Sequence, residues 1–104
     1  EMVRELLIPR LFADYERFGS WWNRRGDEID LLAIGPAGSL AVEIKSRELS
    51  YDDTEIILKN LEVKTGKVKG LTYPVTLGIA ARAVEGKDDL MEKGIQVFEL
   101  NELF

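Results

Sequence analysis

The chain of 104 residues contains no cysteine and no histidine. Without cysteine it can form no disulfide bond and no thiolate nucleophile, and without histidine the Ser-His-Asp and Cys-His catalytic arrangements are excluded. A zinc site of Cys and His ligands is excluded as well. Any bound metal would need oxygen ligands, which favours Mg²⁺, Mn²⁺ or Ca²⁺. Acid–base chemistry would fall to carboxylates, lysine or tyrosine.

Long apolar runs are also absent. No segment approaches the ~20 apolar residues that span a bilayer, and none resembles a signal peptide. With 45% hydrophobic residues, the chain is long enough for one core and too short for two. We therefore expect one soluble, cytoplasmic domain over residues 1–104. Because the sequence starts at Glu1 inside a helical pattern, we expect this domain to belong to a longer protein.

The net charge of −5 is unevenly distributed along the chain. Residues 28–44 carry three acidic and no basic side chains, and residues 70–104 carry six acidic against three basic ones. Residues 45–69 instead carry six basic and five acidic side chains. A phosphate-binding surface could therefore be local even though the whole chain is acidic.

The apolar periodicity predicts a mixed α/β domain with the order α-β-β-β-α-β-α-β. Pro9 predicts a kink or an early end in the first helix, because proline removes a helical hydrogen bond. Asp52, Asp53 and Thr54 are candidate caps of the second helix. The expected helices are 1–13, 53–69 and 86–94, and the expected strands are 15–22, 28–34, 39–46, 74–81 and 95–100.

Strands 28–34 and 39–46 should form a hairpin around the loop GPAG at 35–38. If all four residues belong to the loop, Ile34 lies opposite Ser39. One face of the hairpin is then wholly apolar and must pack on helices. The residues of that face are Ile29, Leu31, Ala33, Leu40, Val42 and Ile44.

The opposite face carries charges at its open end. In the same register Asp30 lies opposite Glu43, and Glu28 lies opposite Lys45, with opposed side chains roughly 4.5–5.5 Å apart. Two adjacent carboxylates repel each other unless a divalent cation lies between them. If the loop were only residues 37–38, however, Asp30 would face Lys45 in an ordinary ion pair worth at most ~1 kcal/mol. The spacing alone leaves both registers open.

In the first register the charges predict a metal-assisted phosphodiester site. Asp30 and Glu43 would hold Mg²⁺ or Mn²⁺, and Lys45, next along the same face, would reach the substrate phosphate. The cation would make its water more acidic, and the lysine would stabilise the charge that develops on phosphorus.

The stretch EIDLLAIGPAGSLAVEIKS (28–46) resembles the PD-(D/E)XK nuclease superfamily, which includes restriction endonucleases and archaeal Holliday-junction resolvases. The expected element order matches the core of that superfamily over nearly the whole chain. The stretch GSWWNRRGDEIDLLAI (19–34) is similar, more closely still, to the nuclease-like domain at the C-terminus of archaeal AAA-family ATPases. This resemblance implies a restriction-endonuclease-like mixed sheet at the C-terminal end of an ATPase chain.

By position, the resemblance implies that Asp30 and Glu43 are metal ligands and that Lys45 is the catalytic lysine. Members often place a further acid on the first helix, for which Glu1 and Glu5 are the candidates. One departure is visible, since Ile29 stands where the family has the proline of its PD motif.

Other residues have both a functional and an ordinary interpretation. In the superfamily the second helix borders the nucleic-acid groove, so Lys64 is a candidate contact to the site or to DNA. Glu28 could support Lys45 or the metal from outside the ligand set, or form a surface pair. Of Trp21 and Trp22, we expect one to pack in the core and the other to be half-exposed, with base stacking as the alternative role.

The sequence and the resemblance together favour a Mg²⁺- or Mn²⁺-dependent DNA phosphodiester hydrolase attached to an archaeal ATPase. The alternative is a catalytically inactive module with the nuclease fold that binds DNA or regulates the attached ATPase. DNA and the ATPase are the expected partners, no membrane partner is expected, and a homodimer is left open.

Overall fold

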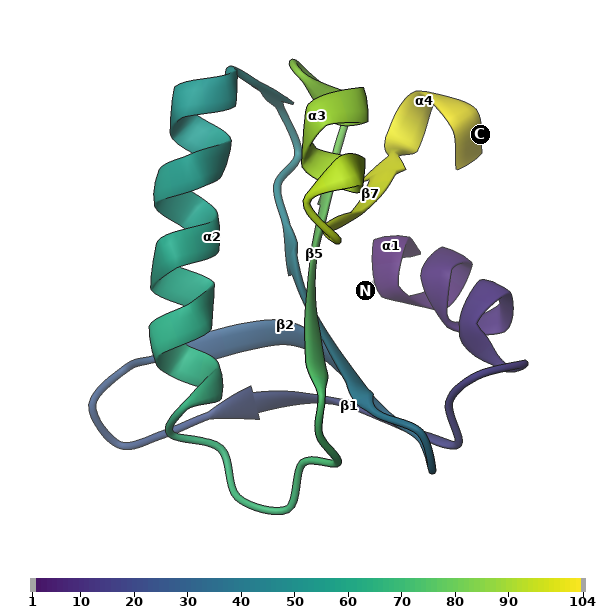
Figure 1. Ribbon diagram of the computed structural model, residues 1–104, viewed down its shortest axis with the longest axis vertical. Helices are drawn as coiled ribbons and strands as arrows, with labels where there is room; N and C mark the ends of the chain where they lie inside the picture. The colour runs from purple at the N-terminus through teal and green to yellow at the C-terminus, as the bar shows by residue number, and fades with distance from the viewer. Residues whose placement is uncertain (1, 104) are drawn as a thin grey trace.

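The computed structural model describes residues 2–103 (Figure 1). The elements in chain order are α1 (Met2–Leu7), η1 (Ile8–Leu11), β1 (Arg17–Trp22), β2 (Glu28–Ile34), β3 (Ser39–Ile44), β4 (Glu48–Leu49), α2 (Tyr51–Thr65), β5 (Val75–Ala81), β6 (Ala83–Val84), α3 (Lys87–Glu92), β7 (Gln96–Glu99) and α4 (Leu100–Leu103). The eight predicted elements are all present in the predicted order. The short elements η1, β4, β6 and α4 were not predicted.

The sheet is mixed and has five strands in the order β1-β2-β3-β5-β7. β1 pairs antiparallel with β2, and β2 antiparallel with β3, whereas β3–β5 and β5–β7 are parallel pairs. The parallel connection from β3 to β5 is made through α2, as parallel strands require a crossover. A second, small sheet is formed by β4 and β6. The hairpin of β2 and β3 therefore lies in the middle of the domain.

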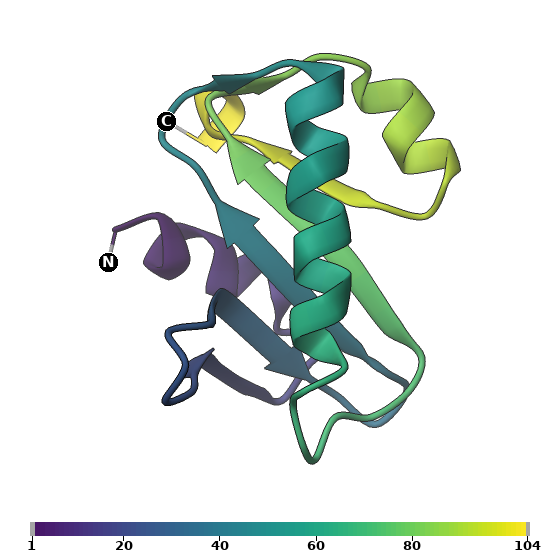
Figure 2. The ribbon, with the colours of Figure 1, turned by 90° about the vertical axis from the view of Figure 1, so that its left-hand side faces the viewer.

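Helices cover both faces of the five-stranded sheet (Figures 1 and 2). On the α2 face, Leu58 and Leu61 belong to a core cluster with Leu32, Ala41 and Ile79 of the strands. The cluster on the α1 face consists of Leu7, Leu11, Leu31, Ala33, Leu40, Val42, Ala80 and Leu100. Figure 1 shows the sheet nearly edge-on between α2 and α1. The two clusters make this a three-layer arrangement in which the central strands are buried on both sides.

The first helix ends early, as Pro9 predicted. The α-helical part stops at Leu7, and the chain continues as the 3-10 turn η1, which carries Pro9 near its start. The change of helix type keeps the apolar stripe in place, because Leu7 and Leu11 are both buried and Val3 packs against the same cluster.

The predicted start of the second helix was wrong by two residues. The cap is Ser50, whose side-chain oxygen accepts a hydrogen bond from the backbone N–H of Asp53 at 3.1 Å. A serine satisfies one of the free N–H groups at a helix start, which is why it is a preferred cap. Asp52 and Asp53 instead occupy the first turn, where their charge favours the positive end of the helix dipole.

One residue of the predicted apolar hairpin face lies on the other side of the sheet. Leu31, Ala33, Leu40 and Val42 pack on the α1 side as predicted, but Ile29 belongs to the cluster on the α2 side. The reason is an irregularity in the pairing with β1, where the register passes from Gly19 opposite Leu32 to Trp21 opposite Ile29. An advance of two residues along β1 thus corresponds to three residues along β2. The extra residue of this bulge reverses the face of the sheet to which the following side chains point.

No helix among residues 2–103 is long and apolar enough to cross a membrane.

Candidate functional site

The register of the central hairpin brings the predicted charges to one place. Ile34 lies opposite Ser39, and Gly35 N–H donates to the Gly38 carbonyl at 2.9 Å across the loop. All four residues of the loop are therefore outside the ladder, which excludes the register that would have placed Asp30 opposite Lys45.

The two strands part just before they reach the charged residues. Their paired positions end at Leu31 and Val42, although β2 begins at Glu28 and β3 continues to Ile44. Asp30 fills the resulting gap, because its Oδ2 accepts a hydrogen bond from the backbone N–H of Ile44 at 2.8 Å. The Asp30 carboxylate is thus held directly against β3.

Glu43 is the charged residue that lies deepest in the site. It is 6% exposed, and Lys64 Nζ donates to its Oε1 at 3.1 Å. Burial raises the pKa of Glu43 above the ordinary value of 4.5, and the neighbouring Asp30 carboxylate adds to the rise. Lys64 and, more weakly, Lys45 lower the pKa, but they do not cancel the effect of burial. Negative charge at this position is therefore only partly compensated.

Lys64 connects α2 to both strands of the hairpin. Besides its bond to Glu43 it donates to the backbone carbonyl oxygen of Glu28 at 2.8 Å. Its side chain is 23% exposed, so the ammonium remains accessible from one side. The structure thus places Lys64 in the candidate site, on the Glu43 side.

The remaining candidates lie around this centre or away from it. Lys45 is half-buried, and its backbone N–H donates to the Ala80 carbonyl at 2.8 Å, which holds the end of β3 against β5. The Glu28 side chain is exposed, and only its backbone contacts Lys64. Glu5 is exposed on α1, and Glu1 lies outside the described residues. Within residues 2–103 no three acidic side chains gather into a group that could hold a metal, so Glu5 does not complete one.

A pocket of about 200 Å³ adjoins Asp30 on the side of β1 and α1. Its lining includes Arg4 of α1 and both tryptophans of β1. As expected, Trp21 packs against the α2-side core, while Trp22 is more exposed than predicted, at 71%. Arg4 was not among the predicted site residues, because nothing in its sequence position distinguishes it from an ordinary helix residue.

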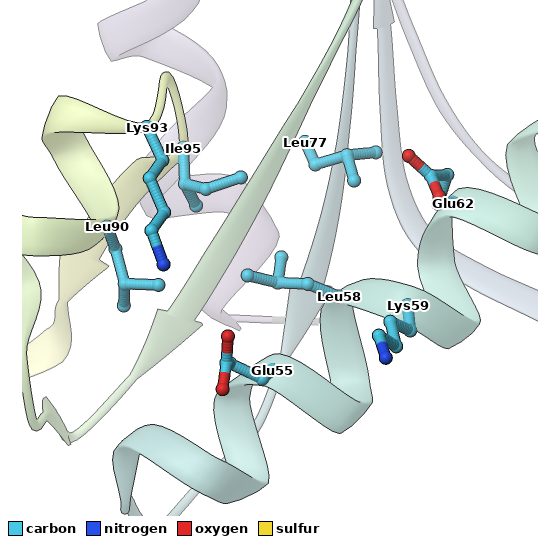
Figure 3. Close-up of a pocket in the computed structure, with 8 residues that line it drawn as sticks. All are labelled: Glu55, Leu58, Lys59, Glu62, Leu77, Leu90, Lys93 and Ile95. Carbon is cyan, nitrogen blue, oxygen red and sulfur yellow. The ribbon is translucent and has the colours of Figure 1, made fainter.

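A second pocket, of about 210 Å³, lies between α2 and α3 (Figure 3). Leu58 and Leu77 face Leu90 and Ile95 across it. None of the residues predicted for the functional site lines this pocket.

Sequence comparison identifies the family. Residues 1–57 match the model of the DUF234 family, which is described as archaea bacterial proteins of unknown function. The chain belongs to the DUF234 family. This DUF234 chain is also 31% identical over 97 residues to the uncharacterized protein MJECL04 of Methanocaldococcus jannaschii. That match covers 86% of the chain but only 22% of the relative, so the chain spans about a fifth of the curated relative's length.

Solved structures include two with a similar arrangement of helices and strands. A repair endonuclease from Pyrococcus abyssi superposes with a TM-score of 0.57 at 15% identity, over 95% of this DUF234 chain and 46% of the endonuclease chain. The EndoMS protein of a complex titled EndoMS-dsDNA2 superposes with a TM-score of 0.51, also at 15% identity, over 95% and 42% of the two chains. The DUF234 chain thus has the mixed α/β, nuclease-like fold of these proteins, and the predicted fold class is confirmed.

Proposed function

We propose that the chain is a metal-dependent DNA phosphodiester hydrolase domain of the PD-(D/E)XK type. The observation that carries the proposal is the junction of β2 and β3, where Asp30 and Glu43 interact at the point at which the two central strands part. The nuclease-like fold supports the same conclusion, since the structural neighbours are titled as an endonuclease and as a DNA complex.

The donor atoms at this junction suit a hydrated Mg²⁺ or Mn²⁺. Both ligands are carboxylates, the type that these cations prefer, and a bound cation would offset the burial and the Asp30 charge that raise the pKa of Glu43. Mg²⁺ is commonly held by one or two carboxylates while it keeps several waters, so a third acidic residue is not required. When bound, such a cation supplies a Lewis acid for the phosphoryl group.

The two lysines would have different tasks in this reaction. Lys45 is close enough to Glu43 to lower its pKa, and it has no ion pair among the described residues, so it is available to contact a phosphate. Lys64 is bound to Glu43 and to the Glu28 carbonyl, so its task is to orient the carboxylate. Lys45 is therefore the residue we assign to stabilising the charge that develops on the phosphate.

The test is cleavage of end-labelled DNA by the chain with Mg²⁺ or Mn²⁺ and with EDTA. Lys45→Ala should lower the cleavage rate by roughly 10²–10³ while the fold is preserved, because one donor to the developing charge is lost. The matched control is Lys59→Ala, which removes an exposed lysine from α2 and should leave the rate unchanged. Equal rates for the two variants, or cleavage that survives EDTA, would rule out this assignment.

The proposal extends to the longer protein. Because the chain covers 22% of its curated relative, we propose that it acts as one domain of a larger chain, attached to an archaeal ATPase. One observation favours the alternative of an inactive module that binds DNA or regulates that ATPase: Lys64 already occupies an oxygen of Glu43. DNA binding in EDTA without cleavage in Mn²⁺ would support this alternative.

A further inference from the structure

The pocket beside Asp30 contains an arginine with an unused hydrogen-bond donor. Arg4 reaches it from α1, and its Nε is buried without a hydrogen-bond partner in the described part of the chain. Nearly all buried N–H groups in native proteins have a partner, so an unused one points to an absent partner such as a water or an anion. A guanidinium has a planar, fork-shaped set of donors that matches the oxygens of a phosphate.

The same pocket has an aromatic side chain at its rim. Trp22 is 71% exposed, whereas its neighbour Trp21 packs against the core. An exposed indole beside a cationic group is the usual arrangement for stacking a nucleic-acid base. In an intact duplex both faces of a base are covered by its neighbours, so such a platform takes an unpaired base.

The dimensions of the pocket limit what it can accept. Its volume of about 200 Å³ is below the roughly 300–1,000 Å³ of pockets that enclose a drug-sized molecule, so it would admit one unit of a longer strand. Glu28 and Asp30 also belong to the lining and would repel a phosphate. Arg4 is the cationic side chain among the described lining residues, so binding should depend on it.

We propose that this pocket binds one unpaired nucleotide of a DNA strand next to the cleavage position, with its phosphate on Arg4 and its base on Trp22. The inference rests on the proposed function, because it is Asp30 that joins the pocket to the candidate metal site. It narrows the substrate to DNA with unpaired nucleotides, such as single strands, strand ends or branch points.

The test measures binding rather than cleavage. Fluorescence anisotropy in EDTA at low salt compares a labelled single-stranded oligonucleotide with a blunt duplex of the same sequence. The single strand should bind more tightly. Arg4→Gln should weaken single-strand binding roughly tenfold or more, and Arg4→Lys should recover part of the loss because the charge remains without the fork. Trp22→Ala should cost roughly 5- to 100-fold for the single strand and little for the duplex.

Matched controls separate these contacts from general effects. Arg10→Gln removes an exposed arginine from η1, and Tyr73→Ala removes an aromatic side chain that is as exposed as Trp22, at 71%. Both should stay within about twofold of the unchanged chain, and circular dichroism should show that every variant is folded.

The outcomes distinguish the two proposals. If the single strand binds no better than the duplex, or if Arg4→Gln and Trp22→Ala bind like their controls, the nucleotide pocket is wrong, whether or not the chain cleaves DNA. If binding depends on both residues but DNA is not cut in Mg²⁺ or Mn²⁺, the pocket is upheld and the hydrolase function fails.

Discussion

The two ends of the β2–β3 hairpin differ in their strand pairing and in the kind of side chain that they bury. At the loop end the strands are paired residue by residue from Leu31 to Ile34, and Leu31, Ala33, Leu40 and Val42 are all 1% exposed or less. At the open end the pairing stops, and the carboxylate of Glu43 is buried there beside the apolar Ile29. The loop end stabilises the fold by burying apolar area, while the open end holds charge in a place where burial makes it costly.

The contrast shows how one part of a hairpin positions another. The loop of residues 35–38 and the apolar pairs determine the register, and this register carries Asp30 and Glu43 to the same junction. Groups with a perturbed pKa gather at functional sites because their chemistry requires an unfavourable environment. Here the apolar packing that stabilises the fold lies a few residues from the unfavourable buried charge, on the same two strands. Substitutions at the two ends should therefore change the free energy of unfolding by different amounts and even in opposite directions.

The largest effect is expected at the loop end. Leu31→Ala should lower the free energy of unfolding by about 2–5 kcal/mol, since Leu31 is fully buried and its truncation leaves a cavity. Urea unfolding measures the change. The matched control is Ile56→Ala on α2, a side chain that is 60% exposed and should change stability by about 0.5 kcal/mol or less. Equal losses for the two variants would contradict the assignment of this end as the stabilising one.

A smaller loss of stability is expected when Lys64, the lysine at the open end, is replaced. Lys64→Met leaves Glu43 buried without its partner and should lower the free energy of unfolding by about 1–3 kcal/mol. Adding Glu43→Gln to Lys64→Met should restore much of the loss, because no buried charge is then left unpaired. Lys59→Met on α2 serves as the control. A double variant no more stable than Lys64→Met alone would show that Lys64 acts by packing rather than by charge.

The smallest change in stability is expected for Glu43→Gln, and it should be a gain rather than a loss. Burial, followed by Asp30, raises the pKa of Glu43 in the folded chain above 4.5, so the folded state binds this proton more tightly than the unfolded state does. The stability that comes from the protonated form is present below pH ~4.5 and is lost as the pH rises through the folded pKa. Glu43→Gln should therefore match the original chain at low pH and become the more stable of the two near pH 7.

Urea unfolding of both proteins at several pH values between 4 and 8 gives the measurement. Glu55→Gln, which removes an exposed acidic residue from α2, accounts for the general effect of one less negative charge. If Glu43→Gln becomes less stable than the original chain as the pH rises, then the bond to Lys64 outweighs the cost of burial.

Local alternation was enough to predict the hairpin, but it left two registers open, and the pairing of Ile34 with Ser39 decides between them. The two strands and the apolar side chains that they share on the α1 side, Leu31, Ala33, Leu40 and Val42, follow from a two-residue period, which is the strongest signal in a strand. For the contact between α2 and the hairpin, the sequence and the resemblance identified Lys64 as a candidate but not its partners. That Lys64 would bond both Glu43 and the Glu28 carbonyl depends on how the last turn of α2 crosses the sheet, and periodicity within α2 carries no such information.

Other features could not be predicted because they arise from pairing between distant segments. Ile29 faces the α2 side because the register between β1 and β2 shifts by one residue at a bulge. The sequence of either strand alone does not indicate this shift. The pairs of β4 and β6 are two residues long, too short to show any period. Arg4 looked like an ordinary helix residue, and its importance appears only when α1 lies beside β1 and β2.

The bond from Ile44 N–H to Asp30 also satisfies a backbone donor that the parted strands would otherwise expose. Strands that part inside a sheet expose backbone donors, and an unpaired row of them is a template for another strand to add to. Here the Asp30 side chain takes the place of the missing strand neighbour at 2.8 Å, so the N–H of Ile44 is not left free to pair with another strand. We therefore expect the residue proposed to bind a cation also to reduce aggregation of the chain. Asp30→Asn, which keeps an acceptor oxygen, should accordingly aggregate less than Asp30→Ala, as light scattering of the two variants would measure.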